Sequence, residues 1–266
     1  MQITSRENSL LRQARLVRDG KVDDLIFVEG LRLAEEALRS DLKIEAVIFS
    51  DELFRKERAA KSIGQLSKAS TRVGSVSEKL LESISYTKTP QGIVVLARRP
   101  ASTFERMNQL VDKKSLLVVL HQINNPVNVG AILRTAEAAG AAGVITTKNT
   151  SDPLSPKSLR GAMGSAFRLR IWSGADYSEV IDWCNSKGIA TVCAAATGDL
   201  SHTEVNWRAG CALILGPESS GLTLKEIAAA KMTVRIPMLG TVESLNVSVA
   251  AGILLYEAAR QRGFKD

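Results

Sequence analysis

One pattern narrows the possible folds of this chain more than any other: from residue 116 onwards, apolar runs alternate with segments of helical periodicity. The runs are about five residues long, and the segments between them carry apolar residues every three or four positions, as helices do. Strands joined through helices pair in parallel, and helices cover both faces of the sheet. We therefore predict an α/β fold with a parallel sheet. Strands are expected at residues 116–120, 143–146, 169–172, 189–194, 211–215 and 233–236, and helices at residues 129–139, 156–162, 177–186, 223–230 and 245–260.

The first hundred residues mix the two periodicities and predict a separate, small α/β domain. Pro100 follows the last apolar run of this part, and a proline among polar residues is typical of a linker. We therefore predict a domain over residues 1–100, a linker over residues 101–114 and a second domain over residues 115–266. In the first domain, strands are expected at residues 25–28, 44–49, 73–76 and 92–97, and helices near residues 30–39, 55–68 and 77–83.

The formal net charge of +7 favours a polyanionic partner, although many basic proteins bind none. Near the N-terminus, Arg12, Arg15 and Arg18 recur every three residues beside the apolar stripe of a predicted helix. A solvated helix face and a surface that contacts RNA phosphates both explain this arrangement.

Several other classes of chemistry find no support. The three cysteines, Cys184, Cys193 and Cys211, fit no metal-binding spacing, and with only two histidines we expect no metal site. They are expected instead as small buried residues in a reducing compartment. Neither GxGxxG nor GxxxxGK(S/T) is present, which argues against NAD or ATP chemistry. The sequence shows no signal-peptide pattern and no run approaching about 20 apolar residues, so we expect a cytoplasmic protein without a membrane partner.

Three loops at predicted strand ends have an unusual composition. The first, NNPVNVG at residues 124–130, leads into a helix that carries Arg134. Asn128 can cap this helix, and Gly130 and Arg134 are four residues apart on one face. Because the loop follows a strand, Arg134 would project near the carboxyl edge of the sheet. A capped helix whose arginine faces solvent is the simpler interpretation.

The second loop, GPESSGL at residues 216–222, directly follows the predicted strand 211–215. Gly216 and Gly221 bracket Glu218 and allow the backbone to approach a ligand closely. Thr223 and Glu226 also form the pattern of a helix capping box, which is compatible with a ligand-binding loop.

The third loop follows the predicted strand at residues 233–236 and runs into the turn Ser244-Leu245-Asn246 and a helix rich in small residues. Such a helix permits close approach of another element. A capped amphipathic helix explains Ser244, but it does not explain why Asn246 and Ser248 both lie in the first turn.

Together, the three loops resemble the motifs of the SpoU (TrmH-like) RNA 2′-O-methyltransferases, a branch of the knotted SPOUT class, in order and spacing across residues 116–260. Asn128, Gly130 and Arg134 match the first motif, N-x-G-x-x-x-R. The other two motifs match Gly216, Glu218, Gly221 and Leu222, and Pro237, Met238, Gly240, Ser244, Leu245, Asn246 and Ser248. One departure is that Asn124 and Asn125 stand where the family often has an acidic residue. The N-terminal segments FVEG (27–30) and TPQG (89–92) resemble a ribosomal-protein-like substrate-binding domain often fused to this catalytic domain.

The resemblance implies a deep trefoil knot around residues 211–260, a homodimer with each cofactor pocket near the subunit interface, and S-adenosylmethionine (SAM) as cofactor. Backbone groups hold the bent SAM in the family. The residues that would hold or surround it here are Gly216, Ile236, Leu245, Met238, Ala195 and Thr197. Apolar and glycine-rich loops of this kind suit a largely apolar ligand such as adenine.

The reaction implied is methylation of a ribose 2′-hydroxyl, in which orientation of the reacting atoms can supply much of the rate. The family proposal makes the arginine of the first motif, here Arg134, the base. A guanidinium keeps its proton in proteins, so we prefer that Arg134 grips an RNA phosphate and stabilises charge developing on the 2′-oxygen. Asn128, Glu218 and Asn246 would orient the arginine and the ribose, and Ser244 would add a hydrogen bond.

The expected substrate is RNA read as a folded feature by the N-terminal domain. RNA contacts are expected from Arg12, Arg15, Arg18 and Arg160. Large-subunit ribosomal RNA is our preferred substrate, and transfer RNA is the alternative. Two rival functions are a non-catalytic RNA-binding homologue and a base methyltransferase of the same class. The intact Arg134, Glu218 and Asn246 argue against the first, and the Ser-Leu-Asn turn argues against the second.

Overall fold

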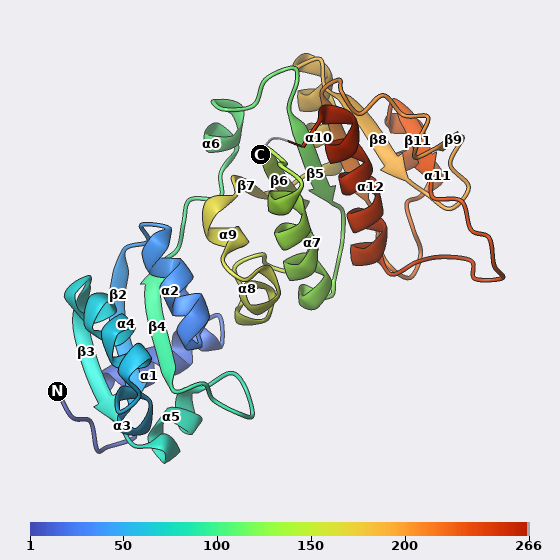
Figure 1. The fold of residues 1–266 in the computed structure, drawn as a ribbon. Coiled ribbons are helices and arrows are strands. Elements are labelled where there is room, and N and C mark those ends of the chain that lie inside the picture. The colour runs from blue at the N-terminus through green and yellow to red at the C-terminus, as the bar shows by residue number, and fades with distance from the viewer. Residues whose placement is uncertain (265–266) are drawn as a thin grey trace. The chain divides into compact units, whose positions relative to one another are not determined.

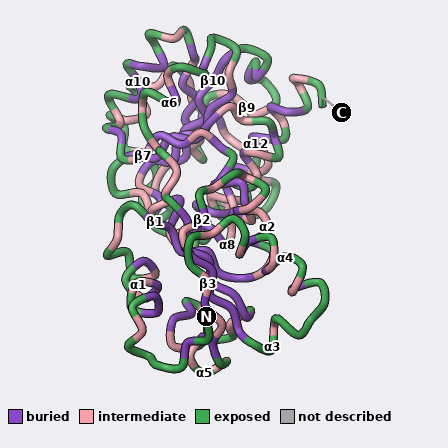
Figure 2. Tube along the Cα trace, turned by 90° about the vertical axis from the view of Figure 1, so that its left-hand side faces the viewer, coloured by how far each residue is buried: buried purple, intermediate pink, exposed green. Residues whose placement is uncertain are grey.

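The computed structural model describes residues 1–264 and divides into two compact units. The first unit comprises residues 1–100 and 154–168, and the second comprises residues 101–153 and the chain from residue 169 onwards. We describe each unit by itself. In both, buried residues are concentrated along the strands, while exposed residues lie mainly in helices and loops (Figure 2).

The second unit is built on a seven-stranded sheet in which every recorded strand pair is parallel, in the order β7-β6-β5-β10-β8-β11-β9. The strands are β5 (Leu116–Leu120), β6 (Gly143–Thr147), β7 (Ile171–Ala175), β8 (Ala190–Ala194), β9 (Leu200–Ser201), β10 (Cys211–Leu215) and β11 (Met232–Arg235). The helices are α6 (Phe104–Asn108), α7 (Pro126–Ala138), α10 (Tyr177–Ser186), α11 (Leu224–Ala229) and α12 (Val247–Arg262). The predicted α/β fold with a parallel sheet is thus confirmed.

Strand order in this sheet positions the site. On one side of β5 lie β6 and then β7, which follow it in the sequence. On the other side lies β10, which stands between β5 and β8. Because the strands are parallel, the loops that follow β5, β8, β10 and β11 all leave the same carboxyl edge of the sheet. Ligands in such sheets bind at this edge, where the strand order reverses.

Helices cover both faces of this sheet, because its central strands are apolar throughout. β5 and β10 are buried along their whole length. In Figure 1, α7 and α12 lie side by side in front of the sheet, and α10 lies behind it. The core on the α10 face includes Trp172 and Trp183, whose rings meet edge to face at 5.6 Å. All three cysteines are buried and unpaired, as expected for small core residues, and burial raises the pKa of Cys184 to about 12.

The first unit has a mixed four-stranded sheet in the order β1-β4-β2-β3, in which β4 runs antiparallel to its two neighbours. Its strands are β1 (Leu25–Glu29), β2 (Ile44–Ser50), β3 (Ser70–Val76) and β4 (Ile93–Arg98). Its helices are α1 (Ser9–Arg18), α2 (Leu31–Arg39), α3 (Asp51–Phe54), α4 (Glu57–Lys68), α5 (Glu78–Ile84), α8 (Pro156–Ala162) and α9 (Ser165–Arg168). The helix α8 packs against β1, and Arg168 of α9 forms an ion pair with Glu36 at 2.6 Å.

Two N-terminal segments that carried the resemblance, FVEG and TPQG, meet in this unit. Glu29 at the end of β1 is buried, and its carboxylate accepts hydrogen bonds from the backbone N–H groups of Tyr86 and Thr87 at 2.8 and 3.2 Å. Gly30 and Gly92 have φ values of +101° and +80°, which glycine adopts without strain. The buried carboxylate therefore fixes the loop that leads into β4.

Several details differ from the sequence-based expectations. The strand expected at residues 169–172 is β7, which begins two residues later, and the two-residue β9 was not predicted because it is too short to show a period. Residues 101–114, expected as a linker, contain α6, whose Met107 is fully buried in the core of the second unit. Residues 154–168 group with the first unit. The division of the chain into domains at residues 1–100 and 115–266 stays a proposal. The trefoil knot around residues 211–260 stays a prediction.

Within residues 1–264, no helix has both the length and the apolar character needed to cross a membrane. The same residues contain no group of three or more His, Cys, Asp or Glu side chains placed to hold a metal ion.

Candidate active site

The first candidate loop forms the start of α7, which begins earlier than predicted. Its N-cap is Asn125, whose side chain accepts a hydrogen bond from Val127 N at 3.0 Å, and Pro126 occupies the first helical turn. The prediction that Asn128 caps this helix is therefore wrong: proline is favoured just inside a helix start, and it moves the cap to the residue before it. Asn125, part of the departure from the family pattern, serves as the cap.

Asn128 consequently lies inside α7, and its side chain is available to the site. It is 6% exposed, and its Oδ1 accepts a hydrogen bond from Asn246 Nδ2 at 3.3 Å. Its Nδ2 has no hydrogen-bond partner within the described part of the chain. A buried N–H group left without a partner costs about 1–3 kcal/mol, so this atom marks a place for a polar ligand.

The third candidate loop ends at Asn246, which is the N-cap of α12. Its Oδ1 accepts hydrogen bonds from Ser248 N at 2.9 Å and from Ser248 Oγ at 2.6 Å. This arrangement explains why Asn246 and Ser248 occur together, and it shows that the cap of the helix is Asn246, so capping does not account for Ser244. With Oδ1 used in capping, Nδ2 of Asn246 is directed to Asn128, and the first and third loops are joined.

A cavity of about 620 Å³ opens at the carboxyl edge of the sheet, among the loops that follow β8, β10 and β11 and the first turns of α12. All six residues predicted to surround the cofactor line it: Ala195, Thr197, Gly216, Ile236, Met238 and Leu245. Three of the residues predicted for catalysis line it as well: Glu218, Ser244 and Asn246. One cavity therefore contains the second and third loops, and the pair Asn246–Asn128 connects it to the first.

The composition of this cavity suits an elongated ligand that is part apolar and part polar. Leu222, Ile227 and Leu254 supply apolar surface, whereas Glu218, Ser244 and Asn246 supply polar groups. Its volume lies in the range of about 300–1,000 Å³ that is usual for cofactor pockets. At Gly216, a Cβ atom would lie 2.7 Å from Leu222 Cγ, so the close approach of these two residues requires glycine.

Arg134 lies on α7, outside the residues that line the cavity. It is exposed, whereas Gly130 one turn earlier is buried, so the two residues do not share a solvent-facing surface. Its guanidinium forms no hydrogen bond or ion pair with any of residues 1–264. A cation without a partner, two turns beyond Asn128 on the same helix, is available to bind an anion.

The other arginines expected to contact RNA differ in their surroundings. Arg15 donates to the carbonyl of Arg6 at 2.9 Å, and Arg18 donates to the carbonyls of Ser83 and Ser85 at 3.4 and 3.3 Å. Arg18 also forms an ion pair with Asp19 at 2.8 Å. Arg12 and Arg160 are exposed, and their guanidiniums make no polar contact to the described residues. Arg15 and Arg18 thus help to hold their own unit together.

One polar cluster near the cavity was missed by sequence reasoning. His121, directly after β5, is buried and contacts Thr147 and Glu226. The capping box at Thr223 and Glu226 was predicted and is confirmed, but no spacing in the sequence connects Glu226 to a histidine 105 residues earlier.

Fold and cavity together define a class: an α/β protein with a cofactor-sized cavity beyond the carboxyl ends of its strands, joined through Asn246 and Asn128 to a helix that carries an exposed arginine. Comparison with known proteins makes this specific. The model of the SpoU rRNA methylase family matches residues 115–256, and that of the MRM3-like substrate binding domain matches residues 12–95. The chain therefore belongs to the SpoU rRNA methylase family, as the resemblance predicted.

Individual relatives agree with this assignment along more than nine tenths of the chain. The 23S rRNA (guanosine-2′-O-)-methyltransferase RlmB of Shewanella oneidensis is 30% identical over 91% of this chain and 99% of its own length. The AdoMet-bound rRNA methyltransferase of Sinorhizobium meliloti is 27% identical, with a TM-score of 0.85 over 98% of this chain and 97% of that chain. The SpoU methyltransferase AviRb of Streptomyces viridochromogenes, in complex with AdoMet, is 26% identical, with a TM-score of 0.84 over 96% of this chain and 98% of that chain.

Proposed function

We propose that the protein transfers a methyl group from SAM to a ribose 2′-hydroxyl of ribosomal RNA, with large-subunit RNA as the substrate. The observation that carries this proposal is the Asn246–Asn128 hydrogen bond at the rim of the cavity, next to a buried amide N–H that lacks a partner. The two asparagines connect the cofactor cavity to the helix that carries Arg134.

The cavity fits SAM in both size and composition. Backbone groups of Gly216, Ile236 and Leu245 would hold it, with Ala195, Thr197 and Met238 beside it. When bound, SAM supplies an activated methyl group on a sulfonium. The work left to the protein is to place the ribose hydroxyl in line with that group and to stabilise the negative charge that develops on its oxygen as the hydroxyl proton passes to water.

The side chains at the rim divide these tasks between them. Asn128 Nδ2 would donate to a ribose oxygen, which gives the buried amide its missing partner. Glu218 and Ser244, on the cavity wall, would accept from and orient the ribose hydroxyls. Arg134 would bind a phosphate of the same nucleotide segment and stabilise the developing negative charge.

The choice of ribosomal RNA rests on the relatives and on the N-terminal unit. RlmB of Shewanella oneidensis and RlmP of Bacillus subtilis are both named as 23S rRNA 2′-O-methyltransferases, and the substrate-binding domain model covers most of the first hundred residues. Arg12 and Arg160 would contact RNA phosphates, because both guanidiniums are exposed and unpaired within residues 1–264. Arg15 and Arg18 would add to the local positive potential.

We also propose that the protein acts in the cytoplasm as a homodimer. Three apolar side chains on the two adjacent helices α7 and α12 are exposed: Val127, Val249 and Tyr256, by 46%, 51% and 49%. Apolar side chains on neighbouring helices are candidates for a protein interface. α7 carries Asn128 and Asn246 caps α12, so a partner bound there would lie near the cofactor cavity.

Calorimetric titration with SAM, followed by methylation of purified RNA fractions, tests the proposal. We expect SAM to bind and the isolated large-subunit RNA to gain one 2′-O-methyl nucleotide, mapped by mass spectrometry of nuclease fragments. Methylation of transfer RNA alone would reject the substrate, and a methylated base would reject the ribose reaction. SAM binding without transfer to any RNA would favour the non-catalytic homologue.

A further inference from the structure

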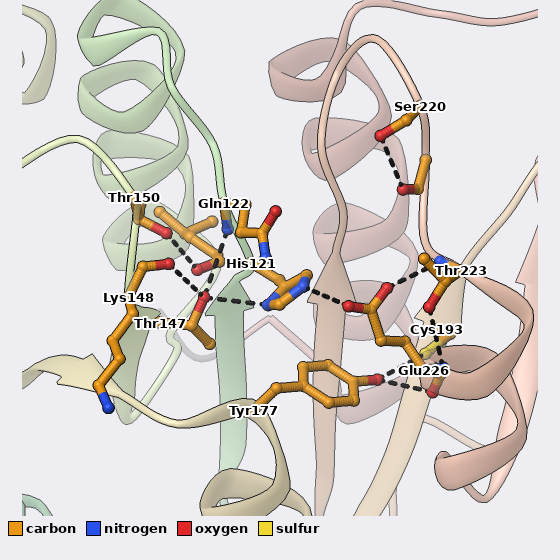
Figure 3. A network of polar contacts seen from close by, with 12 residues as sticks. His121, Gln122, Thr147, Lys148, Thr150, Tyr177, Cys193, Ser220, Thr223 and Glu226 are labelled. Carbon is orange, nitrogen blue, oxygen red and sulfur yellow. Dashed lines mark hydrogen bonds and ion pairs between the residues drawn. The ribbon is translucent and has the colours of Figure 1, made fainter.

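His121 is the centre of a buried polar cluster that the proposed mechanism does not use. It follows β5 directly and is 3% exposed, and its Nδ1 lies 3.0 Å from Thr147 Oγ1 at the end of β6. Its Nε2 lies 2.9 Å from Glu226 Oε1 in α11. Figure 3 shows the imidazole between the two strands on one side and α11 on the other. Because a carboxylate has only acceptors, Nε2 is the donor in the contact with Glu226.

The element that His121 contacts has little else to hold it. α11 is six residues long, none of them is buried, and its first residue, Leu224, is 86% exposed. Apolar contact comes from flanking residues, since Leu222 and Ala230 pack against the core while partly buried. The polar contacts of α11 with the rest of the unit include the one from His121 and one from Tyr177, whose hydroxyl donates to the Glu226 carbonyl at 2.8 Å.

The same helix supports the wall of the cofactor cavity. The segment from Leu215 to Leu222 lines the cavity and leads directly into α11, and Ile227 of the helix lines it as well. The second carboxylate oxygen of Glu226 accepts a hydrogen bond from Thr223 N at 2.7 Å, where the loop joins the helix. One continuous set of contacts therefore runs from His121 through Glu226 to the end of the loop.

The charge of Glu226 fits this role. Burial raises the pKa of its carboxyl, but hydrogen bonds from the backbone and hydroxyl of Thr223 and from His121 outweigh that effect, so the net pKa lies below its usual value. The carboxylate is thus ionised near neutral pH, and hydrogen bonds to an ionised acceptor are among the stronger ones in proteins.

We propose that His121 is a positioning residue that fixes the cofactor-binding loop at residues 215–222 by anchoring Glu226 of α11, although it does not touch the cofactor itself. This inference rests on the proposed function, because it takes the cavity to be the SAM site. Loss of the anchor frees the loop that forms one wall of the cavity, whereas the residues after β8 and β11 keep their places, so binding of SAM is weakened more than turnover at saturating SAM.

Two substitutions at the same position separate anchoring from simple packing. In His121→Gln, the amide nitrogen reaches the position of Nε2 and can still donate to Glu226. In His121→Asn, the shorter side chain reaches only the position of Nδ1 and leaves Glu226 without its donor. Both remove the aromatic ring from the contact with Tyr177, so the loss of the ring contact is the same in the two variants, which differ by one methylene and by the donor to Glu226.

The test is SAM titration calorimetry on the full chain, with KM for SAM and kcat measured in parallel. We expect His121→Asn to weaken SAM binding about tenfold and to raise KM for SAM similarly, and His121→Gln to restore most of the affinity. The loss of kcat should be smaller, because saturating SAM holds the loop and with it Glu218. Equal SAM affinities for the two variants, whatever their melting temperatures, would overturn the inference.

Hydrogen exchange of the backbone amides at residues 218–224 gives a readout that needs no cofactor. These amides should exchange faster in His121→Asn than in His121→Gln, and equal rates would also count against the anchor. If His121→Asn fails to fold, Tyr177→Phe removes the hydrogen bond from Tyr177 to the Glu226 carbonyl of α11 and should weaken SAM binding in the same direction. A wild-type protein that binds no SAM would reject the proposed function, and the exchange measurement would still decide whether His121 anchors the loop.

Discussion

Arg134 is the residue on which the proposed chemistry depends most directly. Its exposed guanidinium has no partner within residues 1–264 and stands on the helix that carries Asn128 into the site. Arg134→Ala should lower kcat by at least about 100-fold, because it removes a group that stabilises charge developing in the transition state. SAM affinity should not change, since Arg134 does not line the cavity.

Single-turnover methylation assays and SAM calorimetry on the same preparation check this prediction. Arg12→Ala is a matched control, because it also removes an exposed, unpaired arginine but lies in the first unit. It should weaken RNA binding modestly and leave the rate with saturating RNA intact. Near-normal turnover of Arg134→Ala would remove the arginine from the mechanism.

Glu257 on α12 makes a prediction about pH and stability. Hydrogen bonds from Arg260 and Gln261 lower the pKa of its carboxyl to about 2, from the ordinary value of 4.5. A carboxylate whose pKa is lower in the folded state stabilises the fold above its unfolded pKa, and the stabilisation is lost as the pH falls through the folded pKa. Glu257→Gln should therefore lower the free energy of unfolding by roughly 1 kcal/mol at neutral pH.

The difference between wild type and Glu257→Gln should shrink as the pH falls from about 4.5 towards 2, and urea unfolding at several pH values measures it. The control is Asp182→Asn, which neutralises an exposed carboxylate of the same unit that has no hydrogen bond to the described residues. A stability difference that is constant over this pH range would show that Glu257 acts through packing and not through its charge.

The loop between β10 and α11 is held in two ways: Gly216 packs closely against Leu222, and Glu226 bonds to Thr223 and His121. Gly216 must be glycine because a Cβ atom there would lie 2.7 Å from Leu222 Cγ and 3.1 Å from Leu222 N. Gly216→Ala should push the two ends of the loop apart and weaken SAM binding by about tenfold or more, as expected when a cavity wall shifts. SAM calorimetry measures the effect.

A second glycine gives a matched control for the loss of backbone freedom. Gly64 lies within α4, and a Cβ atom there would meet nothing within 4 Å. Gly64→Ala should stabilise the first unit by about 0.5–1 kcal/mol and leave SAM affinity unchanged. Unchanged SAM affinity in Gly216→Ala would mean that the loop relaxes without cost and that the close approach to Leu222 is not needed.

For the molecule as a whole, periodicity predicted most of the sheet and the helices, because buried strands such as β5 and β10 are apolar at every position. It placed the start of α7 too late, since Pro126 and Asn125 fix that boundary through a local capping preference. The three loops of the site could be predicted from their composition and from the family resemblance. The cluster around His121 could not, because it depends on contacts between residues far apart in the sequence that only the packed sheet brings together.

The proposed dimer gives the last prediction. Val127, Val249 and Tyr256 expose apolar surface on α7 and α12, and burial of such surface against a second copy would be favourable by roughly 25 cal/mol per Å². Light scattering during size-exclusion chromatography should give twice the mass of the chain for the wild type, and Tyr256→Glu should shift it to the monomer, because a buried charge without a partner opposes association. Leu16→Glu, the same kind of change at an exposed residue of α1, should leave the dimer intact. A wild-type monomer, or a dimer that tolerates Tyr256→Glu as well as Leu16→Glu, would show that these helices do not form the interface.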